Sequence, residues 1–162
     1  DYRSVMPTNL YGPGDNYHPE NSHVLPALIR RIHEAKVDKL NEVIVWGTGA
    51  PKREFLHVDD MASASLFVHN LSKEDYGKCT SERLSHVNVS AGDEISIKDL
   101  AHKITEVIGY EGQISFDLTK PDGAPRKLMD NSLLRKLGWR PRKHLFTGIR
   151  MTYSSFLESI RD

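Results

Sequence analysis

The sequence predicts an α/β fold. Segments with helical periodicity alternate along the chain with short strand-like segments, which is the pattern of α/β proteins. Of the 162 residues, 38% are hydrophobic and 27% are charged, values that are ordinary for a globular protein. This composition excludes disordered, collagen-like and disulfide-scaffold chains, and the length fits one domain.

The N-terminal segment predicts a strand over residues 3–10, followed by a loop. Turn-forming residues crowd positions 11–16, and the polar loop continues to residue 22. Asn21 or Ser22 is the expected N-cap of the next helix. Apolar side chains then recur at the spacing of one helix face, at Leu25, Leu28, Ile29 and Ile32.

The next segment predicts a β-hairpin and a helix. Residues 43–46 form an apolar run, a Gly- and Pro-rich turn follows, and residues 53–58 are the expected return strand. Asp59 or Asp60 is the expected cap of a well-buried helix that ends near Leu71. Residues 73–83 are polar and predict irregular structure.

The clearest helix signal lies in the second half of the chain. Ser96 and Asp99 form a capping box ahead of an apolar stripe, and Gly109 closes the helix. The remaining expected elements are strands over 86–89 and 113–117, a loop over 121–125, a short helix over 131–137, and a final helix over 148–160 capped by Thr147.

The charge balance narrows the classes of partner. The 22 basic and 22 acidic side chains cancel, whereas nucleic acids and anionic membranes select basic surfaces, so neither partner is expected. The single cysteine, Cys79, cannot form an intramolecular disulfide, which favours a cytoplasmic location. The sequence has no membrane-spanning or signal-peptide pattern, and its start at Asp1 predicts a truncated chain.

His23 is the first candidate for chemistry. It lies at the start of the first expected helix, where the dipole favours the neutral imidazole, so it could exchange a proton near neutral pH. The alternative is an ordinary surface or capping histidine, and spacing does not decide between the two. A metal site is not expected, because His18 and His23 do not share a helix face and no cysteine or glutamate completes a set.

Three basic residues could form an anion site. Arg31, Arg53 and Lys127 would bind a diphosphate if the fold brought them together, and otherwise they are solvated surface charges. Trp46 ends an apolar run, so it is either a core residue or a platform on which a base or sugar stacks.

Several motifs together resemble a known family. The blocks carried by residues 6–13 and 53–61 are typical of extended short-chain dehydrogenases, also called the NAD-dependent epimerase/dehydratase family. Two narrower blocks resemble the C-terminal half of the GDP-L-fucose synthase family, namely Asn21-Ser22-His23-Val24 and Lys120-Pro121-Asp122-Gly123-Ala124-Pro125-Arg126-Lys127.

The resemblance implies a homodimeric, NADP(H)-dependent oxidoreductase that epimerises a GDP-4-keto-6-deoxy sugar at C3 and C5 and then reduces C4. The chain would be one partial unit, residues 1–162. It would hold the last Rossmann elements, at about 1–10 and 58–90, and a small mixed α/β substrate-binding domain, without the N-terminal NADP-binding domain.

The resemblance also assigns roles to residues. His23 would be the catalytic acid that protonates the enolate carbon during epimerisation, and it would also touch the cofactor. The residues expected at the nicotinamide end of NADP(H) are Pro7, Thr8, Asn9 and Leu10. The residues expected to contact the GDP-sugar are Arg31, Trp46, Arg53, Asp122 and Lys127.

Three parts of the family machinery are missing from the sequence. Reduction in this family uses a Tyr and Lys four residues apart, and no tyrosine here has Lys at that spacing. No Gly-x-Gly-x-x-Gly fingerprint occurs, and Cys79 does not match the cysteine base of epimerisation. The chain alone is therefore expected to be inactive. The alternatives are another nucleotide-sugar epimerase or dehydratase of the same family, or a non-catalytic GDP-sugar-binding module.

Overall fold

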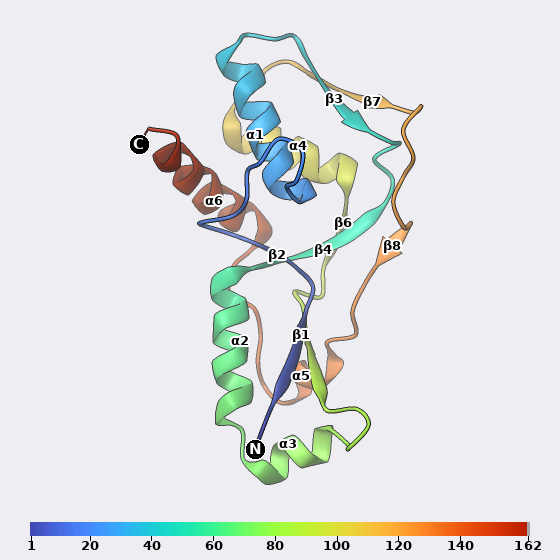
Figure 1. Cartoon of the computed structure of the whole chain (residues 1–162), viewed down its shortest axis with the longest axis vertical. Coiled ribbons are helices and arrows are strands. Elements are labelled where there is room, and N and C mark those ends of the chain that lie inside the picture. The colour runs from blue at the N-terminus through green and yellow to red at the C-terminus, as the bar shows by residue number, and fades with distance from the viewer. Residues whose placement is uncertain (162) are drawn as a thin grey trace.

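The computed structural model describes residues 1–161, which form two lobes along one long axis (Figure 1). The upper lobe in that view holds α1 (Val24–Val37), β3 (Glu42–Trp46), α4 (Ile97–Ile108), β7 (Gln113–Asp117) and α6 (Leu145–Ser159). The lower lobe holds β1 (Ser4–Pro7), α2 (Val58–Asn70), α3 (Lys73–Cys79), β5 (His86–Val89) and α5 (Ser132–Lys136). Between them lie β2 (Asn9–Tyr11), β4 (Lys52–His57), β6 (Glu94–Ser96) and β8 (Arg126–Lys127).

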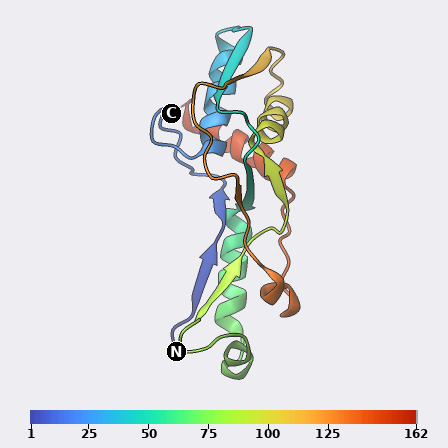
Figure 2. The same ribbon diagram turned by 90° about the vertical axis from the view of Figure 1, so that its right-hand side faces the viewer.

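β4 is the strand that joins the two lobes. It pairs in parallel with β2 and with β8, and antiparallel with β6. In the lower lobe, β1 pairs in parallel with β5, and Figure 2 shows these two strands side by side along α2. In the upper lobe, β3 pairs in parallel with β7. The predicted α/β class is confirmed, with parallel and antiparallel pairings in one chain.

Two strand predictions were wrong. The strand expected over 3–10 is two strands that break at Thr8 and enter different sheets. The hairpin expected over 43–58 does not exist, because β3 and β4 have different partners. Gly47 and Gly49 have φ values of 80° and 73°, a conformation that favours glycine, and they turn the chain away from a return strand.

Each lobe has its own hydrophobic core. In the upper lobe, the buried face of α4 meets buried side chains of α1 and α6. In the lower lobe, Val87 and Val89 of β5 pack with Ala64 and Val68 of α2. The α2 prediction was wrong in extent, since Leu66 remains 63% exposed and the helix buries only one face.

Local capping signals were reliable only in part. Ser96 accepts the Asp99 N–H and Gly109 ends α4 in the left-handed conformation, so the capping-box prediction is confirmed. By contrast, the N-caps of α1, α2 and α6 are His23, His57 and His144. The expected caps Asn21 or Ser22, Asp59 or Asp60, and Thr147 were wrong.

The remaining differences concern short or polar elements. Ser72 caps α3 within a stretch that predicted irregular structure. β6 and β8 span only three and two residues, too short for a periodic signal. Within residues 1–161, none of the helices combines the length and the apolar character needed to cross a bilayer.

Candidate functional site

A cavity of about 760 Å³ lies where the chain passes from β1 to β2, and we call it the His23 cavity. Its lining residues come from three separate segments: Pro7, Thr8, Asn9, Leu10, Asp15, His23, Lys127, Leu128 and Met129. All four residues expected at the nicotinamide end of NADP(H) line it, together with the candidate acid and one of the candidate phosphate-binding cations.

The break between β1 and β2 builds one side of this cavity. Because β1 belongs to one sheet and β2 to another, residues 7–10 cross from the lower lobe to β4. Asn9 is held there by a 2.9 Å hydrogen bond from its Nδ2 to the Glu54 carbonyl oxygen. His23 is the N-cap of α1 and makes no side-chain capping bond, so its ring is not used to close the helix.

Asp15 lines the same cavity and was not among the candidate residues. Burial raises the pKa of its carboxyl, and the Asn16 N–H and nearby His23 partly oppose that rise. Its Oδ1 accepts the Asn16 N–H at 2.8 Å, while its Oδ2 is buried and has no hydrogen-bond partner. Asp15 lies among turn-forming residues, and aspartate is itself common in turns. No local feature of the sequence therefore indicated that it lines a cavity.

A second cavity, of about 710 Å³, contains the other candidates, and we call it the Trp46 cavity. Its lining residues include Arg31, Trp46, Arg53 and Asp122, from α1, the end of β3, β4 and the loop after β7. Trp46 is 62% exposed, which excludes the interpretation as a core residue. The Arg31 guanidinium lies 5.6 Å from the centre of its ring and the Lys120 ammonium 5.5 Å.

The loop before β8 is fastened to the turn after β3. Asp122 accepts hydrogen bonds from the Thr48 N–H at 2.9 Å and the Thr48 hydroxyl at 2.6 Å. A Cβ at Gly47 would lie 2.3 Å from Asp122 Oδ1, so this approach requires glycine. Arg53 donates to the Lys52 and Ala124 carbonyl oxygens, both at 2.7 Å. These bonds hold one wall of the Trp46 cavity in place.

The two cavities adjoin each other. Arg53, in the Trp46 cavity, and Lys127, in the His23 cavity, are paired positions of β4 and β8. Likewise, Ser22 and Val24 line the Trp46 cavity on either side of His23 in the sequence. An elongated ligand with a phosphate-rich middle could therefore extend from one cavity into the other.

Asp59 and Asp60, which follow β4 at the start of α2, have structural roles. Asp60 is buried and accepts the backbone N–H groups of Arg142 at 3.0 Å and Lys143 at 2.8 Å, which fastens the segment before α6. His57 is also buried, and its Nδ1 accepts the Asp59 N–H at 3.2 Å. In the part of the chain that the structure describes, no cluster of three potential metal ligands occurs.

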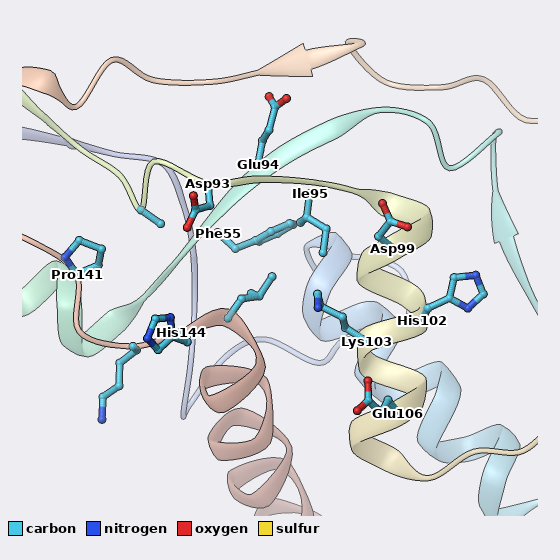
Figure 3. A pocket seen from close by; sticks show the side chains of 13 residues that line it. Phe55, Asp93, Glu94, Ile95, Asp99, His102, Lys103, Glu106, Pro141 and His144 are labelled. Atoms are coloured by element: carbon cyan, nitrogen blue, oxygen red, sulfur yellow. The ribbon is translucent and has the colours of Figure 1, made fainter.

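A third cavity of about 670 Å³ lies between α4 and the start of α6 (Figure 3). Both acidic and basic side chains line it, among them Asp93, Lys103, Glu106 and His144. None of the candidate site residues lines it. The site built from the sequence candidates is therefore the pair formed by the His23 and Trp46 cavities.

The fold and the paired cavities define a class of protein. The family model described as "NAD dependent epimerase/dehydratase family" matches residues 1–80. This match agrees with the resemblance that the motifs at residues 6–13 and 53–61 indicated.

Within this family, the chain is similar to GDP-L-fucose synthases. It is 55% identical to the GDP-L-fucose synthase of Escherichia coli, over 98% of this chain and 50% of that protein. It is 54% identical to GDP-L-fucose synthase 1 of Arabidopsis thaliana, over 99% of this chain and 47% of that protein. The chain thus spans about half the length of these relatives.

Solved structures show the same relationship. A GDP-L-fucose synthetase from Naegleria fowleri, determined bound to NADP, superposes with a TM-score of 0.85 and is 29% identical in sequence. The superposition covers 98% of this chain and 47% of that one. The mixed α/β fold is therefore that of one half of this enzyme type.

Proposed function

We propose that this chain is the substrate-binding portion of an NADP(H)-dependent enzyme that makes GDP-L-fucose by 3,5-epimerisation and 4-reduction of GDP-4-keto-6-deoxy-D-mannose. The observation that carries the proposal is that ten candidate residues from separate segments line two adjoining cavities. The identity of 55% to a GDP-L-fucose synthase supports the same substrate class. The lone cysteine agrees with a cytoplasmic enzyme, and the family resemblance suggests a homodimer.

In this proposal the Trp46 cavity holds the GDP moiety. Arg31 and Arg53 provide guanidinium groups that can bind phosphate oxygens in pairs, and the exposed Trp46 indole provides a surface for stacking. Lys127 adds a point charge at the boundary with the His23 cavity. These three cationic side chains are distributed over both cavities, so they favour a diphosphate over a monophosphate.

The His23 cavity would hold the sugar and the nicotinamide end of NADP(H). Its walls of Pro7, Leu10 and Met129 are suited to an uncharged ring, and Thr8 and Asn9 supply polar groups beside it. The chain lacks the glycine-rich fingerprint for the cofactor's pyrophosphate, so these residues fit only that end of the cofactor. The bound cofactor would supply the hydride that reduces C4.

His23 would be the proton donor of the epimerisation. Loss of a proton beside the C4 ketone gives an enolate, and protonation of its carbon from the opposite face inverts that centre. His23 lies in the cavity proposed for the sugar, and its ring makes no capping bond to α1. The acid could then take up a proton again from solvent.

We also propose that β1, α2 and β5 complete the sheet of the cofactor-binding half. β1 pairs with β5 as a two-stranded sheet in the described residues, and Met6 and Leu66 are exposed beside it. A strand from that half would pair with the other edge of β1. A non-catalytic GDP-sugar-binding module is the second candidate, since the sequence has no Tyr and Lys at the family's spacing.

Calorimetric titration of the chain with GDP and, in parallel, with NADPH tests the proposal. Saturable GDP binding with little NADPH binding is expected, because the cavities here include the nucleotide-sugar site and only one end of the cofactor site. A folded chain that binds neither ligand contradicts the assignment. Combining the chain with a relative's cofactor-binding half then distinguishes the enzyme, which regains turnover, from the binding module.

A further inference from the structure

Glu54 is a fully buried acidic residue in the middle of β4 that belongs to neither cavity lining. Its two carboxylate oxygens accept backbone N–H groups from different loops. Oε1 accepts the Gly92 N–H at 3.1 Å, and Oε2 accepts the Met129 N–H at 2.9 Å. Both oxygens are thus occupied as hydrogen-bond acceptors.

The backbone of the same residue holds a second part of the lining of the His23 cavity. The Glu54 carbonyl oxygen accepts the Asn9 side-chain amide at 2.9 Å. Asn9 and Met129 both line the His23 cavity, and they arrive there from segments 120 residues apart. One residue of β4 therefore connects both walls.

The segment that Glu54 holds also carries Lys127. β8 ends at Lys127, two residues before Met129, and pairs with β4 at Arg53, the residue next to Glu54. Loss of the Met129 bond would release residues 128–129, which follow this strand. β8 itself stays fixed, because it pairs with β4 and Arg126 forms an ion pair with Glu94, so Lys127 keeps its place.

We propose that Glu54 is a positioning residue that sets the distance between the Asn9 and Met129 walls, and thereby the fit of the sugar end of the ligand. The proposal rests on the proposed function, because it takes the His23 cavity as the sugar site. The nucleotide end, bound in the Trp46 cavity, depends on Glu54 much less. Glu54 lines neither cavity, and its burial cannot be read from the sequence. No sequence feature therefore marks it as part of a binding site.

The test compares two ligands in the Glu54→Gln variant of the 162-residue chain. Glutamine keeps the shape of the side chain, but its NH2 group replaces one acceptor oxygen. An NH2 group cannot accept a hydrogen bond from the N–H donor that faces it. We expect the affinity for GDP to change less than twofold, while the ratio of GDP-L-fucose to GDP affinity falls about tenfold. Glu106→Gln is the matched control, because Glu106 is an exposed glutamate on α4 that lines neither the His23 cavity nor the Trp46 cavity.

Equal losses for GDP and GDP-L-fucose would overturn the proposal and make Glu54 a general stabiliser of the fold. An unchanged ratio would overturn it as well. If the unmodified chain binds neither ligand, the proposed function itself fails, and this outcome is separate because it appears before any substitution is made.

Amide NMR gives an independent readout. N–H groups that donate to a carboxylate resonate at unusually low field, so the Gly92 and Met129 signals should move upfield in Glu54→Gln. If the glutamine variant does not fold, Glu54→Asp is used instead, since it keeps the charge but retracts it by one methylene. Signals of Gly92 and Met129 that stay in place in a folded variant contradict the proposal.

Discussion

Arg53 and Lys127 occupy paired positions of the parallel strands β4 and β8, although 73 residues separate them in the sequence. Each lines a different cavity, so this pairing fixes the relative position of the two sites. It also puts two cations near the boundary where the diphosphate of a nucleotide sugar would lie. The pairing makes the phosphate-binding role of both residues testable by separate substitutions.

Replacing Arg53 with lysine should weaken GDP binding about tenfold. Lysine keeps the charge but loses the planar fork that can bind two oxygens, and it loses the bonds to the Lys52 and Ala124 carbonyls. Calorimetry with GDP and GMP measures the effect, which should be larger for GDP. Arg126→Lys is the matched control, because Arg126 is on β8, the strand that pairs with β4 beside Arg53, but it bonds Glu94. Equal losses in both variants would argue against the role of Arg53.

Binding of GDP should change the fluorescence of Trp46. The indole is exposed and has Arg31 and Lys120 beside it, so a stacked base would alter its surroundings. In Trp46→Phe we expect the saturable change to disappear and the GDP affinity to fall about threefold to tenfold. Trp139→Phe should keep the change, because Trp139 is buried and bonds Ser63 in the lower lobe. A change that persists without Trp46 would contradict the stacking role.

His23→Gln should stop proton exchange at C3 and C5 of the sugar in the complete enzyme, with a loss of about 100-fold or more. Binding of the GDP-sugar should stay within about threefold, because the nucleotide is proposed to lie in the Trp46 cavity. Exchange in deuterated water, followed by NMR, measures the first effect, and calorimetry the second. His102→Gln on α4 serves as the control. Lost binding with preserved exchange would reverse the assigned role.

The stability of the chain should fall as the pH is lowered below about 6.5. Burial lowers the pKa of His57 from its ordinary value of 6.5, aided by Lys143 and opposed by Asp59 and Asp60. The unfolded chain therefore takes up the proton first, and stability that is complete above pH 6.5 is lost below it. The slope should reach at most about 1.4 kcal/mol per pH unit for this one proton.

Urea unfolding at several pH values checks this prediction. His57→Asn keeps an N-cap acceptor for the Asp59 N–H but removes the titrating ring, so its stability should vary less between pH 5 and 7 than that of the wild type. His102→Asn, which replaces an exposed histidine on α4, should keep the wild-type slope. An unchanged slope in His57→Asn would show that His57 does not control the pH dependence.

Several elements could be predicted from the sequence because their signals are local. The capping box at Ser96, the apolar stripe of α4 and Gly109 all lie within fifteen residues, and the structure has each of them in place. The hairpin prediction failed because strand pairing is not local. β3 pairs with β7, although 66 residues lie between Trp46 and Gln113. No sequence pattern in either strand predicts this pairing.

The sequence by itself determined the α/β class, the resemblance to a family and the candidate residues with suitable chemistry, because composition, periodicity and motifs can be read along the chain. Whether Trp46 is core or exposed, whether Arg53 lies near Lys127, and what Glu54 holds were decided only by the tertiary structure. The physical reason is that these properties depend on which distant strands pair. A buried glutamate and a solvated one are identical in the sequence, and only the packing of the folded chain decides which of them is buried.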